Sequence, residues 1–164
     1  MFEIVINKKK INKNSPVYII AEAGVNHNGS LIKAKKLIDI AVKAKADAIK
    51  FQTFKTENII IPKGPKAKYH IETTGSDKSL SWFKLLKSQE ISIKMHKELI
   101  KYCKKKKITF LSTAYDQESA TLLNNLKIDA FNERLAGDVG DLTLKGVADF
   151  LTSDGRGFSA TDDT

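Results

Sequence analysis

One stretch, Tyr18–Ser30, constrains the fold of this chain more than any other, and it reads YIIAEAGVNHNGS. Val17–Ile20 is continuously apolar and rich in β-branched residues, which is typical of a strand buried on both faces. A polar loop follows, and Ser30 stands where it can cap a helix that begins at Leu31. In parallel α/β proteins the carboxyl ends of strands carry the functional residues. Glu22 and the loop after it are therefore candidate site residues.

Strand and helix patterns alternate along the rest of the chain, and this alternation predicts parallel βαβ units. Before them, Met1–Lys13 predicts a small amino-terminal hairpin, and a long insertion, Lys55–Ser88, is expected to cover a site. The expected elements after the first strand are helix Leu31–Ala46, strand Ala48–Thr53, helix Ser92–Lys105, strand Ile108–Thr113, a helix containing Ala120–Leu123, and the start of a strand at Ile128–Phe131.

The second expected strand, AIKFQT, carries two polar side chains on one face. Period-two geometry places Lys50 and Gln52 together, with Ile49, Phe51 and Thr53 on the other face. In an open sheet such a face is simply solvated. Inside a closed barrel, a lysine needs an anion to offset its loss of hydration. The pattern alone leaves both interpretations open.

Cysteine and histidine content limits the chemistry. A single cysteine, Cys103, excludes an internal disulfide and indicates a cytoplasmic protein. His70 and His96 show no metal-ligand spacing with each other or with His27, so we expect both to be surface residues. No apolar run is long enough to span a bilayer, and the amino terminus lacks the pattern of a signal peptide.

Charge is divided unevenly along the chain, whose formal net charge is +9. Residues 1–131 contain 25 lysines, no arginine and 12 acidic residues, whereas residues 132–164 contain one lysine, two arginines and seven acidic residues. The second segment also holds five of the nine glycines and no isoleucine. We therefore expect one unit over residues 1–131 and a compositionally foreign ending, frame-shifted or fused, over residues 132–164. A flexible acidic tail is the alternative.

Four blocks in the correct order resemble the sialic acid synthase family: IAEAGVNHNGS, ADAIKFQTFK, KELIKYCKKKKITFLSTAYD and KIDAF. The resemblance covers about residues 15–131. It implies an α/β fold, the first three to four βα units of a TIM-type (β/α)₈ barrel preceded by a short hairpin. It also implies condensation of phosphoenolpyruvate with an N-acetylated amino sugar, either N-acetylmannosamine or a precursor of legionaminic or pseudaminic acid, with release of phosphate.

The resemblance also assigns roles to individual residues. Glu22 corresponds to a carboxylate that binds sugar hydroxyls, and Gln52 to a sugar contact. Lys50 and Thr113 correspond to groups that hold phosphoenolpyruvate, which is sensible because a trianion needs cationic and hydroxyl donors. Glu22 and Lys50 are thus the expected catalytic residues. The expected substrate-binding residues are Gln52, Thr113, Asn26 and His27, the last two as motif residues that shape the loop.

Several features of the family are missing or altered. The family uses a divalent metal, Mn²⁺ or Mg²⁺, in a homodimer, but its two histidine ligands have no counterpart here. Asn132–Leu135 replaces a lysine and a serine that bind phosphoenolpyruvate. Lys45, Lys107 and Lys127 replace glycines expected near helix ends, at a cost of about 1 kcal/mol each if φ is positive there. We expect a truncated chain that is inactive alone.

Two alternative functions stay open. One is another phosphoenolpyruvate aldol synthase, of the octulosonate-phosphate or heptulosonate-phosphate type. The other is a non-catalytic basic binding module. The lysines are spread over helix exteriors and no aromatic-interleaved basic patch is present, so we expect neither a nucleic-acid nor a membrane partner.

Overall fold

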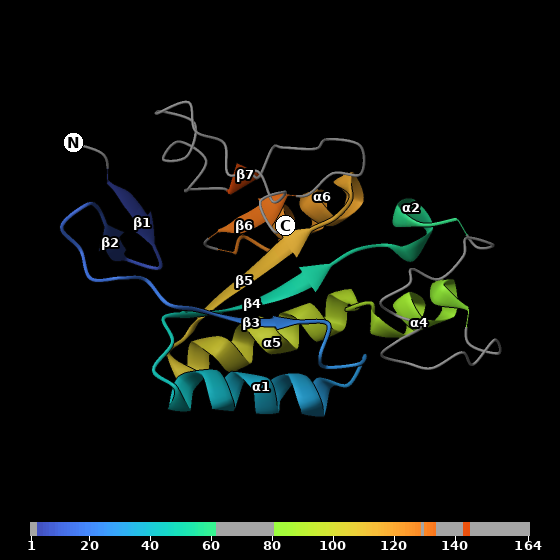
Figure 1. Cartoon of the computed structure of the whole chain (residues 1–164), viewed down its shortest axis with the longest axis horizontal. Coiled ribbons are helices and arrows are strands. Elements are labelled where there is room, and N and C mark those ends of the chain that lie inside the picture. Colours follow the sequence, from blue (N-terminus) through green and yellow to red (C-terminus); the bar gives the residue numbers. More distant parts are fainter. Residues whose placement is uncertain (1–2, 62–80, 129, 134–142, 145–164) are drawn as a thin grey trace, which may run out of the picture.

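The computed structural model describes residues 3–61, 81–128, 130–133 and 143–144. In these residues a twisted sheet carries helices on one face, and a separate hairpin lies at the end of the sheet where its strands begin (Figure 1). The hairpin pairs β1 (Ile4–Ile6) with β2 (Lys9–Ile11) in antiparallel register. None of the helices in the described residues is long and apolar enough to cross a membrane.

The sheet has the strand order β3-β4-β5-β6-β7. Neighbouring strands from β3 to β6 are parallel, and β7 is antiparallel to β6. The prediction of parallel βαβ units is confirmed for these strands. The strands are β3 (Ile20–Gly24), β4 (Ala48–Thr53), β5 (Thr109–Ala114), β6 (Phe131–Glu133) and β7 (Thr143–Leu144).

Four of the five described helices begin at side-chain caps that the sequence specifies. Ser30, Ser92 and Asp116 each accept a hydrogen bond from the backbone N–H three residues later, which satisfies a donor that the first turn leaves free. Ser30 is the predicted cap. The helices are α1 (Leu31–Lys43), α2 (Thr56–Ile59), α4 (Trp82–Gln89), α5 (Ile93–Lys106) and α6 (Gln117–Asn125).

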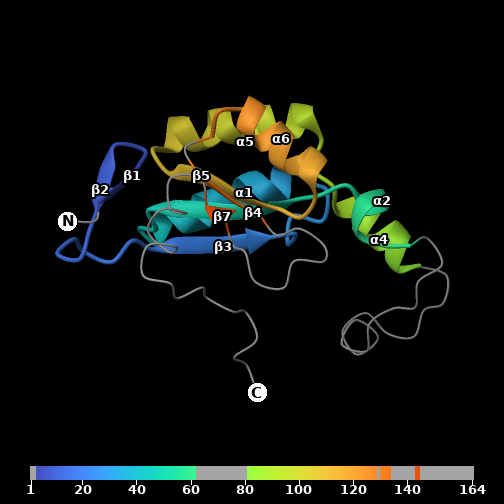
Figure 2. The same ribbon diagram turned by 90° about the horizontal axis from the view of Figure 1, so that it is seen from above.

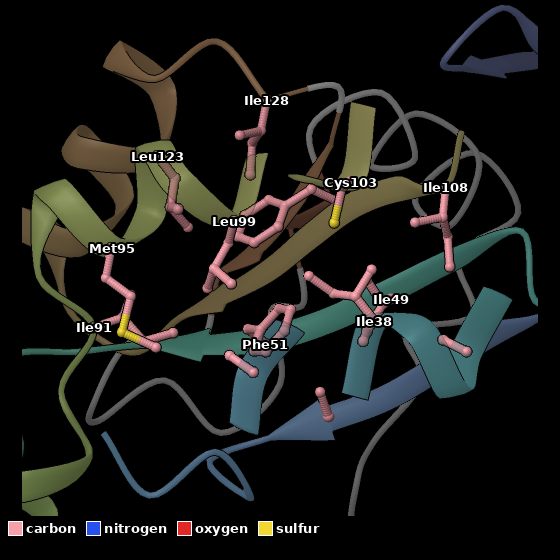
Figure 3. Packing of buried hydrophobic residues seen from close by; sticks show 14 of the residues in the cluster. Ile38, Ile49, Phe51, Ile91, Met95, Leu99, Cys103, Ile108, Leu123 and Ile128 are labelled. Atoms are coloured by element: carbon pink, nitrogen blue, oxygen red, sulfur yellow. The ribbon is translucent and has the colours of Figure 1, made fainter. Parts of the chain in front are cut away.

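The main core lies between the sheet and helices α1, α5 and α6 (Figures 2 and 3). Phe51 is fully buried and stacks on Phe110 with ring centroids 5.6 Å apart. Ile38 and Leu99 reach the same core from α1 and α5, and both are fully buried. Each such side chain stabilises the fold by about 2 kcal/mol through burial.

A second, smaller cluster lies on the opposite face of the sheet. Ala48, Leu111 and Ala130 pack there against Ile6 of the hairpin. Ala48 and Ala130 stand near the starts of their strands, so the hairpin covers the amino-terminal end of this face. The carboxyl-terminal end of the same face is left to polar side chains.

The first strand differs from its prediction. Strand β3 begins at Ile20, and Val17 and Ile19 are 83% and 54% exposed, so the prediction of a strand buried on both faces is wrong. β3 is an edge strand of the described sheet, with β4 as its one neighbour. At Ile19 the Asp47 carboxylate accepts the backbone N–H at 2.7 Å, taking the place of a strand partner.

The last parallel strand is also shifted. It begins at Phe131, whereas Ile128 is buried among the core residues before the strand starts. The composition break at Phe131 thus falls inside β6. Most of the tail, and residues 62–80 of the long insertion with His70, lie outside the described residues. The foreign origin of residues 132–164 stays a prediction.

Candidate functional site

An ion pair joins the first two parallel strands midway along their lengths. Glu22 and Lys50 are register partners of β3 and β4, and Glu22 Oε2 lies 3.0 Å from Lys50 Nζ. The other carboxylate oxygen, Oε1, accepts the backbone N–H of Gly24 at 3.0 Å. Because the side chains are 52% and 27% exposed, such a pair contributes only about 0–1 kcal/mol to stability. The pair is therefore easily reorganised by a ligand.

The four expected site residues on β3, β4 and β5 share one face of the sheet. Lys50 pairs with Leu111, and Gln52 pairs with Thr113, so the period-two alternation keeps them on the face opposite the helices. Ile49 and Phe51 belong to the helix-covered core. Glu22, Lys50, Gln52 and Thr113 therefore share the helix-free face of the sheet, and only Gln52 and Thr113 lie near the carboxyl ends of their strands, which are drawn in Figure 1. Their role as one site stays a prediction.

The loop after β3 separates the two other expected residues from this group. Asn26 is exposed, whereas His27 is fully buried with its ring centroid 6.0 Å from that of Phe51. Gly29 donates its backbone N–H to His27 Nδ1 at 3.0 Å, so the ring proton resides on Nε2. Burial lowers the pKa of His27. His27 therefore holds the loop from the helix side, and its role toward substrate stays a prediction.

His96 is not a surface residue, so that prediction is wrong. Its ring is fully buried, with Nδ1 3.0 Å from the Ser92 carbonyl oxygen and Nε2 2.9 Å from Thr53 Oγ1. Burial lowers the pKa of His96 to about 4, so the ring is neutral and donates from Nδ1 to Ser92. Nε2 then accepts from Thr53, which in turn accepts from Ser112 at 2.7 Å.

A sequence signal for this buried histidine exists. His96 stands at helical spacing with Ser92, Leu99 and Cys103, and Leu99 and Cys103 are buried residues of the same helix. The hydrogen-bonded chain of His96, Thr53 and Ser112 joins α5 to β4 and β5 directly behind Gln52 and Thr113. These hydrogen bonds hold β4 and β5 in place next to Gln52 and Thr113, which lie on the opposite face of the sheet.

Asp116 ties together the loops that leave β4 and β5. Its carboxylate accepts the backbone N–H groups of Lys55 and Ser119, the Ser119 hydroxyl and the Asn58 amide. Burial alone would raise the pKa of Asp116, but these hydrogen bonds outweigh it and the pKa lies below its ordinary value. Sequence analysis missed this residue, although its helix-cap position was a usable signal.

The end of the long insertion lies against the loop after β3. Gln89 Nε2 donates to Asn28 Oδ1 at 3.3 Å. At Gly29, whose φ is +70°, an added Cβ would stand 2.2 Å from the Ser88 carbonyl oxygen. The loop and the end of α4 therefore approach so closely that only glycine fits. The expectation that this insertion covers a site stays a prediction, because residues 62–80 lie outside the described residues.

The three lysines that stand where glycines were expected adopt left-handed backbone conformations. Lys45, Lys107 and Lys127 have φ values of +59°, +58° and +51°. The backbone at these positions therefore has the positive φ that is expected where relatives of the resembled family have glycine. No group of three or more His, Cys, Asp or Glu side chains in the described part of the chain could hold a metal ion. The side chains at the strand ends do not fit a metal site by themselves.

The sequence of this chain is similar to those of known proteins. The NeuB family model matches residues 37–132. An N,N'-diacetyllegionaminic acid synthase of Campylobacter jejuni is 51% identical over 131 residues, which is 79% of this chain and 38% of the relative. A spore coat polysaccharide biosynthesis protein of Bacillus subtilis is 41% identical over 77% of this chain and 32% of its own length.

A solved structure shows the same arrangement. The N-acetylneuraminic acid (sialic acid) synthetase of Leptospira borgpetersenii, crystallised with citrate, superposes with a TM-score of 0.62 and 34% identity. The match covers 79% of this chain and 40% of that structure, so the chain spans about a third to two fifths of the relatives it matches. It has their α/β fold with a parallel sheet and covering helices. The family match over more than half of its length shows that the chain belongs to the NeuB family.

Proposed function

We propose that this chain forms the first part of the phosphoenolpyruvate site of a nonulosonic acid synthase. The curated relatives include synthases of legionaminic, pseudaminic and sialic acid type. The product suggested by the 51% identical relative is N,N'-diacetyllegionaminic acid, which would make an N-acetylated amino sugar the second substrate. The sheet would be the first strands of a closed barrel, with its helix-free face inside.

One observation carries the proposal: a half-buried lysine in the middle of a parallel strand lies on the face opposite the helices, beside Glu22 of the neighbouring strand. Lys50 has no partner there except Glu22 among the described residues. An incoming dianion would compete with Glu22 for this ammonium group, since the existing pair is partly exposed and weak. Charge-assisted hydrogen bonds to a phosphate or carboxylate are stronger than neutral ones.

The side chains next to Lys50 can bind phosphoenolpyruvate and an amino sugar. Thr113 is 6% exposed and can donate its hydroxyl to the anion. Gln52, which is half-buried beside Thr113 in register, offers an amide that can both donate to and accept from a sugar hydroxyl. Once it is released from Lys50, the carboxylate of Glu22 can accept hydrogen bonds from sugar hydroxyls. Together these groups would orient two reactants, which is a major source of rate enhancement in condensations.

Binding of phosphoenolpyruvate tests the Lys50 assignment. We expect Lys50→Ala to weaken binding by about tenfold or more in isothermal titration, because it removes the cation of a charge-assisted contact. Lys35→Ala is the matched control, since Lys35 pairs with Glu98 at 3.5 Å and is 31% exposed, but lies on the helix side. Equal losses in both variants would contradict the site.

Glu22→Gln gives an independent readout. It removes the negative charge that competes with the ligand, so we expect phosphoenolpyruvate to bind more tightly than in the parent chain while any sugar contact is weakened. Weaker phosphoenolpyruvate binding in Glu22→Gln would show that the carboxylate holds Lys50 in place for the ligand. In the complete synthase a divalent metal would supply Lewis-acid chemistry at the sugar aldehyde, and its ligands would come from outside the described residues.

A further inference from the structure

A cavity of about 570 Å³ opens at the amino-terminal edge of the sheet, far from the strand ends described above. It lies between the turn of the hairpin, the last turn of α5, the start of β5 and the turn after α6. Asn7 of the hairpin donates from Nδ2 to Thr109 Oγ1 at 3.2 Å, which fixes one wall. The cavity is large enough for a small organic molecule.

The charge around this cavity is entirely positive. Lys8, Lys104, Lys107 and Lys127 line it, and no acidic residue is among its lining residues. None of the four lysines forms an ion pair within the described residues, although seven other lysines do. All four lysines are exposed residues, and together they give the cavity a positive potential that favours an anion. The Cys103 thiol does not offset this charge, because burial raises its pKa to about 12.

The remaining lining is apolar. Ile100, Cys103, Ile108, Phe110 and Ile128 contribute to the cavity surface. Such a surface favours an aromatic or aliphatic group, whereas the lysines favour a dianion. The combination matches the usual composition of small-molecule sites, which are mostly apolar with a few convergent charged groups.

The lysines stand where their backbone is unfavourable. Lys8, Lys107 and Lys127 have φ values of +68°, +58° and +51°, and the neighbouring Asn7 has +46°. A left-handed conformation costs a non-glycine residue about 1 kcal/mol, so three ammonium groups gather at one cavity at the expense of fold stability. Strain of this kind concentrates at functional sites. Lys45 has the same strain but does not line the cavity, so strain and position can be separated.

We propose that this cavity binds a small organic phosphate, with the phosphate among the four lysines and the organic group against the apolar wall. The site is distinct from that of Lys50. Thr109 begins β5, and Thr113 lies four positions further along the strand, about 13 Å away. The two sites can therefore be occupied together.

Phenyl phosphate is a suitable probe, with inorganic phosphate and phenol as its two halves. Binding is measured by isothermal titration on the whole chain carrying Lys50→Ala, so that the strand-end site does not contribute. We expect phenyl phosphate to bind more tightly than either half. We expect the double variant Lys107→Gly/Lys127→Gly to weaken binding by about tenfold, since it removes two charge-assisted contacts.

Glycine keeps the left-handed backbone at both positions, so this double variant tests the charges without threatening the fold. Lys45→Gly is the matched control, with the same backbone change outside the cavity, and it should bind like the parent. Unchanged affinity in the double variant, an equal loss in Lys45→Gly, or no binding of phenyl phosphate would overturn the proposal. Inorganic phosphate binding as tightly as phenyl phosphate would also overturn it, because the apolar wall would then contribute nothing.

Discussion

His96 is held neutral in the interior, and this makes stability depend on pH. Its pKa is about 4 in the folded chain and about 6.5 when unfolded, so between these values the unfolded chain binds more protons. Stability should therefore fall as pH drops from about 6.5 toward 4, by on the order of 3 kcal/mol from this group. Urea unfolding at pH 7.5, 6.5 and 5.5 measures the slope.

His96→Gln removes the titrating group but keeps a donor and an acceptor near Ser92 and Thr53. The variant should be less stable at neutral pH yet lose less stability between pH 6.5 and 5.5 than the parent. The pH slope of stability is also measured in His27→Gln, because burial lowers the pKa of His27 in the same direction. Identical pH slopes in the parent and His96→Gln would show that His96 is not the group responsible.

Replacing a lysine that has a left-handed backbone conformation should increase stability. Lys107→Gly and Lys45→Gly should each raise the free energy of unfolding by about 1 kcal/mol, because glycine adopts positive φ without steric cost. Lys43→Gly is the control, since Lys43 is an exposed residue in the last turn of α1 and should lose about 1 kcal/mol instead. Thermal denaturation distinguishes the two signs. A loss at Lys107 would mean that its side chain stabilises the fold through contacts that outweigh the strain.

The contact between the loop after β3 and α4 can be tested with two glycines. Gly29→Ala should destabilise the chain by about 2 kcal/mol or more, because its Cβ would meet the Ser88 carbonyl at 2.2 Å and its φ is +70°. Gly24→Ala has a similar φ of +51°, but its Cβ would meet atoms no closer than 3.7 Å, so only about 1 kcal/mol is expected.

Hydrogen exchange gives the structural readout for these two variants. In Gly29→Ala, protection should fall in Trp82–Gln89 as well as in the loop, because the two segments can no longer pack as they do. In Gly24→Ala, protection of α4 should be retained. Equal effects on α4 in both variants would contradict the close approach at Gly29.

Sequence patterns predicted correctly those elements whose apolar residues are also the buried ones in the structure. Strand β4 has the predicted bounds, and Lys50 and Gln52 share the predicted face because strict alternation leaves one register. The apolar run before Glu22 was misleading, since Asp47 supplies a side-chain acceptor to Ile19 that no local pattern reveals. His96 was wrongly expected at the surface: its helical spacing with Leu99 and Cys103 indicated the buried side, but its partner Thr53 is 43 residues away in the sequence.

Within the described residues, the sheet ends at β3, which has a strand partner on one side only. Ile19 and Ile20 are 54% and 44% exposed beside this edge, so we expect the isolated chain to self-associate as its concentration rises. Ile20→Lys should reduce the association, because a charge at an edge opposes strand pairing. Light scattering during size-exclusion chromatography measures the mass, and a parent chain that stays monomeric at all concentrations would contradict this expectation.

Phosphate release tests the chain as a whole. The chain spans 38% of its legionaminic acid synthase relative, so we expect no phosphate release from phosphoenolpyruvate and an amino sugar with this chain alone. A phosphate-release assay with Mn²⁺ provides the measurement, and Lys50→Ala is its control. Turnover that Lys50→Ala abolishes would show that the described strands form a working site. The homodimer of the complete family members stays a prediction.

The shared carboxylate of Asp116 has a consequence for engineering. It binds the backbone of the loop after β4 and caps the helix after β5, so these two segments share one anchor. Grafting either segment alone from a relative would leave a buried carboxylate with part of its donors missing. Chimeras should therefore exchange the two segments together, as one cassette that carries its own anchor.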